Sequence, residues 1–116
     1  MRKIFAARLI ELTEGSLIPF EVEDFGIVLF RNGHDIRAYQ RLCPHRGMPL
    51  DLFGMIKEGI LICGAHNFPF SADSGQYKRE VPNCSNIRMY PVEIEGDSVF
   101  ILIPTGQESD LVSTAQ

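Results

Sequence analysis

The stretch Cys43-Pro44-His45-Arg46-Gly47, followed by Cys63-Gly64-Ala65-His66, decides how this chain is interpreted. Each segment carries one cysteine and one histidine, and residues 46–62 separate the two pairs. Thiolate and imidazole groups are the ligands that soft and borderline transition metals prefer. The spacing therefore predicts a metal centre held between two loop tips by two thiolates and two imidazoles.

Two kinds of centre fit this ligand set. A structural zinc site takes four such ligands in a tetrahedron, but zinc motifs usually keep the two cysteines together and the two histidines together. Here each short segment mixes the two residue types, as a two-iron cluster held from two sides requires. Zinc remains the alternative, and it predicts a colourless protein.

The residues around these pairs resemble those of the Rieske proteins. The first loop fits the family's C-P-H-R-G sequence, and an aromatic pair and a turn follow the second loop, at Phe68, Phe70 and Asp73-Ser74-Gly75. The resemblance covers nearly the whole chain. It implies one [2Fe–2S] cluster, with Cys43 and Cys63 on one iron and His45 and His66 on the other. It also implies an all-β Rieske fold, in which an antiparallel sandwich or barrel base carries an inserted cluster-binding subdomain over about residues 40–82.

The ligand set also bears on the reduction potential. With two neutral imidazoles the oxidised centre is uncharged, so it accepts an electron more readily than a four-thiolate cluster does. High-potential family members carry a serine and a tyrosine hydroxyl at the positions of Phe68 and Phe70, and a disulfide at those of Met48 and Ala65. Fewer hydrogen bonds to sulfur destabilise the reduced form. We therefore expect the low-potential branch, with a potential of roughly −150 mV.

Composition limits the remaining possibilities. The 116 residues fit one domain, and 45% hydrophobic and 22% charged residues are typical of a soluble globular protein. A net charge of −4 argues against nucleic-acid binding. No stretch resembles a signal peptide or a membrane span. Of three cysteines only Cys84 is left over, so we expect no disulfide framework and a cytoplasmic location.

Short apolar stretches separated by turn signals predict an all-β fold. We expect strands over 4–10, 18–22, 27–30, 36–40, 59–62, 68–70, 89–94 and 98–103. Asn32-Gly33 and Glu95-Gly96-Asp97 predict hairpins, 49–53 could form one helical turn, and Asn67 could adopt the left-handed conformation. We expect one domain over 1–104 and a flexible tail over 105–116.

The resemblance implies a soluble ferredoxin that carries single electrons from a flavin-dependent reductase to a terminal oxygenase of aromatic or hydrocarbon oxidation. The nearest likeness is to ferredoxin components of toluene-type monooxygenases. We expect a monomer with transient partners and no catalysis of its own, with Asp51 and Asp73 on solvated faces. The alternative is the small Rieske subunit of a larger redox enzyme, such as an assimilatory nitrite reductase.

Overall fold

The computed structural model describes residues 2–22, 25–44, 47–64, 67–79 and 85–103. They form three antiparallel sheets. The first has the order β1 (Arg2–Arg8), β10 (Ser98–Ile103), β9 (Val92–Glu95); the middle sheet has the order β2 (Leu17–Val22), β3 (Phe25–Asn32), β4 (Asp35–Gln40), β8 (Met89–Tyr90). The third has the order β5 (Gly54–Lys57), β6 (Ile60–Cys63), β7 (Phe68–Ser71). The predicted all-β fold is confirmed, whereas the tail expected over 105–116 lies outside the described residues.

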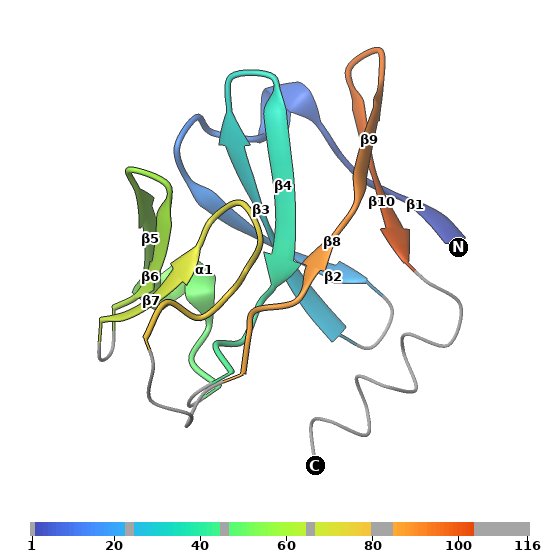
Figure 1. Ribbon diagram of the computed structural model, residues 1–116. Helices are drawn as coiled ribbons and strands as arrows, with labels where there is room; N and C mark the ends of the chain where they lie inside the picture. Colours follow the sequence, from blue (N-terminus) through green and yellow to red (C-terminus); the bar gives the residue numbers. More distant parts are fainter. Residues whose placement is uncertain (1, 23–24, 45–46, 65–66, 80–84, 104–116) are drawn as a thin grey trace.

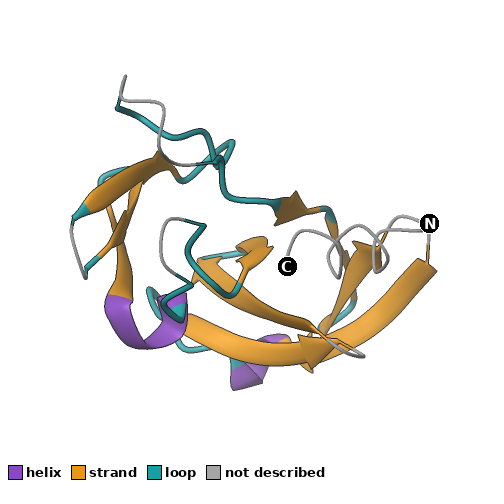
Figure 2. Cartoon of the chain, turned by 90° about the horizontal axis from the view of Figure 1, so that it is seen from below, coloured by secondary structure: helices purple, strands orange, loops and turns teal. Residues whose placement is uncertain are grey.

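The middle sheet lies between the other two (Figure 1). The helical turn α1 (Leu50–Phe53) packs between β5 and β2 and confirms the turn expected over 49–53 (Figure 2). In the part of the chain that the structure describes, no helix has the length and apolar character to cross a membrane.

Both faces of the middle sheet are covered, and this explains the continuous apolar run in β3. Ile27 and Leu29 face the first sheet, Val28 faces the third, and all three side chains are fully buried. We call the two clusters the base core and the loop core. The base core comprises Ala6, Ala7, Leu12, Ile27, Leu29, Ile36, Ala38, Tyr90, Val99, Ile101 and Ile103. The loop core comprises Val28, Tyr39, Cys43, Leu50, Leu61, Cys63, Phe70, Tyr77 and Ile87.

Both predicted hairpins are confirmed. Asn32 pairs with Asp35 across the β3–β4 turn, and Glu95 pairs with Ser98 across the β9–β10 turn. Each turn contains a glycine with positive φ, at 64° for Gly33 and 63° for Gly96. Most residues avoid positive φ because their Cβ would clash with the backbone, whereas glycine has no Cβ and adopts it readily.

Two of the predicted strands have the wrong extent, and one strand was not predicted. The strand expected over 89–94 is two strands in different sheets, because Tyr90 pairs with Ala38 while Val92 pairs with Ile101. Pro91 separates them, and a proline supplies no N–H to either ladder. Strand β1 ends at Arg8 and a 3₁₀ turn, Leu9–Glu11, follows it. Strand β5 was not predicted.

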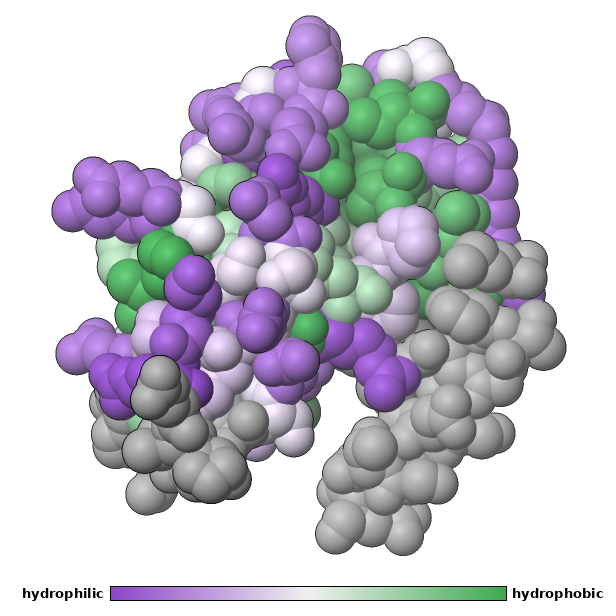
Figure 3. All heavy atoms as spheres, in the orientation of Figure 1, coloured by the Kyte–Doolittle hydropathy of each residue, from purple (hydrophilic) through white to green (hydrophobic). Residues whose placement is uncertain are grey.

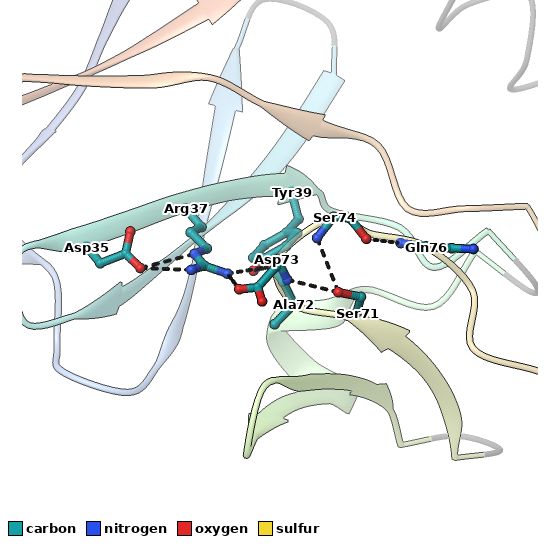
Figure 4. A network of polar contacts seen from close by, with 8 residues as sticks. All are labelled: Asp35, Arg37, Tyr39, Ser71, Ala72, Asp73, Ser74 and Gln76. Carbon is teal, nitrogen blue, oxygen red and sulfur yellow. Dashed lines mark hydrogen bonds and ion pairs between the residues drawn. The ribbon is translucent and has the colours of Figure 1, made fainter.

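A polar network fastens the third sheet to the middle sheet (Figure 4). The Tyr39 hydroxyl donates to the Ala72 carbonyl at 2.6 Å, and the Arg37 guanidinium donates to the same oxygen at 3.0 Å. Arg37 also forms ion pairs with Asp35 and Asp73. Asp73 is exposed, as expected, but its carboxylate also forms an ion pair with Arg37. The network connects β4 to the turn that follows β7.

Candidate metal centre

Cys43 and Cys63 occupy one buried region, although 19 positions separate them in the sequence. Cys43 follows β4 and Cys63 ends β6; their exposed fractions are 1% and 0%, and both belong to the loop core. Within the described chain neither is joined in a disulfide. The fold therefore brings the two predicted thiolate ligands to the same side of the middle sheet.

The first loop is tied to itself by backbone hydrogen bonds. The Cys43 N–H donates to the Met48 carbonyl at 2.8 Å, and the Gly47 N–H donates to the Cys43 carbonyl at 2.7 Å. Gly47 has φ of 71°, which confirms the need for glycine there. Met48 is half-buried against the loop core. These contacts hold the Cys43 end of the loop in one conformation.

An ion pair closes the base of this loop. Arg41 Nε donates to Asp51 Oδ1 at 2.8 Å, and the Leu50 N–H donates to the Arg41 carbonyl at 2.7 Å. The Asp51 side chain is only 6% exposed, so the expectation of a solvated carboxylate is wrong. A carboxylate removed from water needs a charged or hydrogen-bonding partner, and Arg41 provides it. The hydrogen bond with Asp51 in turn raises the pKa of Arg41 above its usual value.

The second loop begins where β6 meets its neighbours. Cys63 pairs with Gly54 on one side and with Phe68 on the other. The Gly64 N–H donates to the Phe53 carbonyl, and a Cβ at position 64 would collide with that oxygen. Glycine is therefore required next to Cys63 because α1 approaches the strand so closely.

The far side of this loop is held by Asn67 and Arg79. Asn67 has φ of 55°, which confirms the predicted left-handed conformation. Its carbonyl accepts a hydrogen bond from Arg79 Nη2 at 3.1 Å, and the Arg79 guanidinium lies 5.4 Å from the centre of the Phe68 ring. Arg79 thus places a positive charge beside the second loop.

The two predicted histidine ligands, His45 and His66, lie outside the described residues, and so does Cys84. Among the described residues there is no group of three or more metal-binding side chains, as expected when two of the four proposed ligands are not among them. The two cysteines do fit the cluster. Their thiols lie in an apolar core, where a thiolate needs a cation to compensate its charge.

A family model, the Rieske [2Fe-2S] domain, matches residues 3–91. The chain belongs to this family. The cofactor of the family is a Rieske-type [2Fe–2S] cluster, so the resemblance found in the sequence is confirmed.

Proteins similar to this chain include ferredoxin components of oxygenase systems. That of the alkene monooxygenase system of Xanthobacter autotrophicus is 30% identical over 78% of this chain and 73% of the relative. That of the naphthalene 1,2-dioxygenase system of Pseudomonas aeruginosa is 31% identical over 84% of this chain and 92% of the relative. Among solved structures, the ferredoxin of carbazole 1,9a-dioxygenase from Nocardioides aromaticivorans has a TM-score of 0.77 at 24% identity, over 87% of this chain and 97% of that one. At this identity the structural likeness concerns the fold alone.

Sequence reasoning found the two cysteines but missed the residues that support them. Arg41 and Asp51 are ten positions apart without a helical spacing that would suggest a pair, and Arg79 lies twelve positions after Asn67. The loops bring these partners together. Little in the sequence signals these supports: Arg41 lies two positions before Cys43, but residues 59–70 around the second pair contain no charged residue.

Proposed function

We propose that this chain is a Rieske ferredoxin that receives single electrons from a flavin-dependent reductase and passes them to the terminal oxygenase of an aromatic or hydrocarbon oxidation system. The observation that carries the proposal is the burial of Cys43 and Cys63 in one core, within a chain similar to ferredoxin components over most of its length. When bound, the cluster supplies a centre that accepts and releases one electron.

The ligands in this proposal are Cys43, His45, Cys63 and His66. The cysteines bind from the protein interior, and the loops that follow each of them carry the histidines. Imidazoles on the outer iron leave their second ring nitrogen available to a partner. Phe68, half-buried beside Cys63 and under Arg79, lines the approach to this edge.

The surroundings of the loops support transient association. In Figure 3 hydrophobic residues gather over β9 and β10 and, in a smaller group, at the left of the molecule. Exposed apolar side chains also lie on the segments around the two loops, at Leu42, Leu52, Phe53 and Met55. The exposed residues beside the second loop include Asn67, Lys78 and Arg79. A transient interface commonly has apolar side chains at its centre and charged or polar ones at its rim, and this mixture fits partners that bind and leave. We propose a cytoplasmic monomer whose basic rim meets an acidic partner surface.

Visible absorption and metal analysis of the purified chain test the cofactor. We expect a coloured protein with two irons and two sulfides per chain, and one unpaired electron per chain in the EPR spectrum after one-electron reduction. A colourless protein containing one zinc would overturn the proposal in favour of the structural site. Stopped-flow mixing of the reduced chain with an oxidised terminal oxygenase then tests electron delivery. Reoxidation no faster than in buffer would contradict the assigned role.

The small subunit of a larger redox enzyme remains the competing function. Gel filtration with a candidate partner separates the two possibilities. A shuttle should elute alone at the mass of one chain, whereas a subunit should co-elute with its partner at micromolar concentration.

A further inference from the structure

The ion pair between Arg41 and Asp51 lies largely removed from water. The Asp51 side chain is 6% exposed and that of Arg41 is 31% exposed. Arg41 Nε donates to Asp51 Oδ1 at 2.8 Å, and Arg41 Nη2 donates to Asp51 Oδ2 at 3.4 Å. Apolar residues of similar volume often stabilise a fold as well as a buried ion pair does, because desolvation of the charges offsets their attraction. Stability alone therefore does not explain this pair.

The pair stands at the end of a short antiparallel ladder that joins the two arms of the first ligand loop. The Cys43 N–H donates to the Met48 carbonyl at 2.8 Å, and the Leu50 N–H donates to the Arg41 carbonyl at 2.7 Å. Asp51 follows Leu50 directly, so its ion pair with Arg41 lies on the side of the ladder away from the loop tip. The pair can therefore determine which residue of one arm faces which residue of the other.

A competing register of this ladder is favourable in hydrophobic terms. Leu42 is 49% exposed and Cys43 is 1% exposed, because neighbouring side chains of an extended segment point to opposite faces. A slip of this arm by one residue would exchange the two and bury a leucine in place of the thiol. Apolar burial alone therefore does not keep Cys43 in the loop core with Cys63, and a specific polar contact is required.

Arg41 is itself fixed to the middle sheet. Its N–H donates to the Gly26 carbonyl at 3.2 Å, near the start of β3. Its side chain lies across Gly26, where an added Cβ would come within 3.0 Å of Arg41 Cδ. The missing side chain at position 26 leaves room for the guanidinium to reach Asp51. One end of the ion pair thus belongs to the sheet and the other to α1, on the far arm of the loop.

We infer that Arg41 and Asp51 are positioning residues that fix the register of the first ligand loop, so that Cys43 rather than Leu42 lies in the loop core. The inference rests on the proposed function, in which Cys43 is a ligand of the cluster. A slipped chain would keep only Cys63 in the core. Buried polar contacts fix the register of some coiled coils in the same way, at no gain in stability.

The test replaces both charges at once, because losing either one alone would leave the other buried without its partner. Arg41→Met combined with Asp51→Leu should lower the cluster content of the purified chain at least about twofold, because the slipped register then competes with the native one. In the fraction that holds the cluster, amide hydrogen exchange of Leu29 and Ile101 should change by less than about threefold, since the base core keeps its packing.

A third substitution tests the register itself. Leu42→Ser, added to the double variant, removes the apolar group that favours the slipped register and should restore the cluster content. The matched control is Leu52→Ser, which makes the same change at a side chain that is 68% exposed on α1 and should restore nothing. Visible absorbance and iron analysis per chain measure the content of each variant.

Full cluster content in the double variant would overturn the inference. Faster exchange at Leu29 and Ile101 would overturn it as well, because the ion pair would then be a general support of the fold. So would a failure of Leu42→Ser to restore the content, or equal restoration by Leu52→Ser. A wild-type chain that contains no iron would instead refute the proposed function.

Discussion

Removing both donors to the Ala72 carbonyl should destabilise the protein by more than the sum of the two single losses. Tyr39 and Arg37 reach this oxygen from β4, and Ala72 is only 4% exposed (Figure 4). In Tyr39→Phe the carbonyl keeps the Arg37 donor, so the loss is that of one hydrogen bond, about 1 kcal/mol. In the double variant with Arg37→Met the buried carbonyl loses both donors, which adds a penalty of about 1–3 kcal/mol.

The assay is the rate at which visible absorbance bleaches in urea, because unfolding releases the chromophore. A loss of about 1 kcal/mol should speed bleaching by Tyr39→Phe about fivefold. The double variant should bleach at least about fivefold faster than the product of the two single effects predicts. The hydrogen bond with Asp73 raises the pKa of Arg37 above its usual value. The guanidinium of Arg37 therefore stays charged throughout the assay. If the rate increase of the double variant equals the product of the two single increases within about a factor of two, the carbonyl is not a shared acceptor.

Three further predictions concern the cluster itself. Cys43→Ser should abolish cluster incorporation, since metal binding and folding are coupled, whereas Cys84→Ser should leave the visible spectrum unchanged; the opposite pattern would refute the ligand assignment. Gly64→Ala should lower cluster content because its Cβ meets the Phe53 carbonyl. Gly59→Ala places its Cβ in open space but strains a backbone with φ of 79°, so it should cost stability and still retain the cluster; equal cluster content in the two variants would contradict the close approach at Gly64. The potential should be constant near neutral pH and fall at alkaline pH, where the histidine ligands of the oxidised form ionise first. A potential independent of pH up to strongly alkaline solution would argue against histidine ligation.

The strands were predictable from the sequence wherever the local pattern of apolar residues matches their burial in the fold. The continuous run 27–30 indicated a central strand, and β3 is central because both its faces are covered. Strand β5 was missed because it is four residues long and two of them, Met55 and Lys57, are exposed. Its place depends on pairing with β6, which the sequence of β5 does not encode.

The sequence offers candidate ligands for the site, but it does not reveal the residues that support them. Ligand types at fixed spacing single out Cys43 and Cys63 as candidate ligands without knowledge of the fold, and the structure buries both in one core. The burial of Asp51 and the stacking of Tyr77 on Phe68 depend on how α1 and the segment after β7 pack. Such contacts join residues that no local periodicity relates, so only the three-dimensional structure reveals them.

The two cores on opposite faces of the middle sheet have a consequence for how such a carrier can diversify. Base-core residues such as Leu29 and loop-core residues such as Val28 alternate along β3, so their side chains point to opposite faces of the sheet. A change of volume in the base core is therefore separated from the cysteines by a hydrogen-bonded layer of backbone. Selection can alter the base, including surfaces over β9 and β10, while the electronic properties of the metal centre stay constant. We therefore expect substitutions in the base core to change the stability of the fold more than the reduction potential.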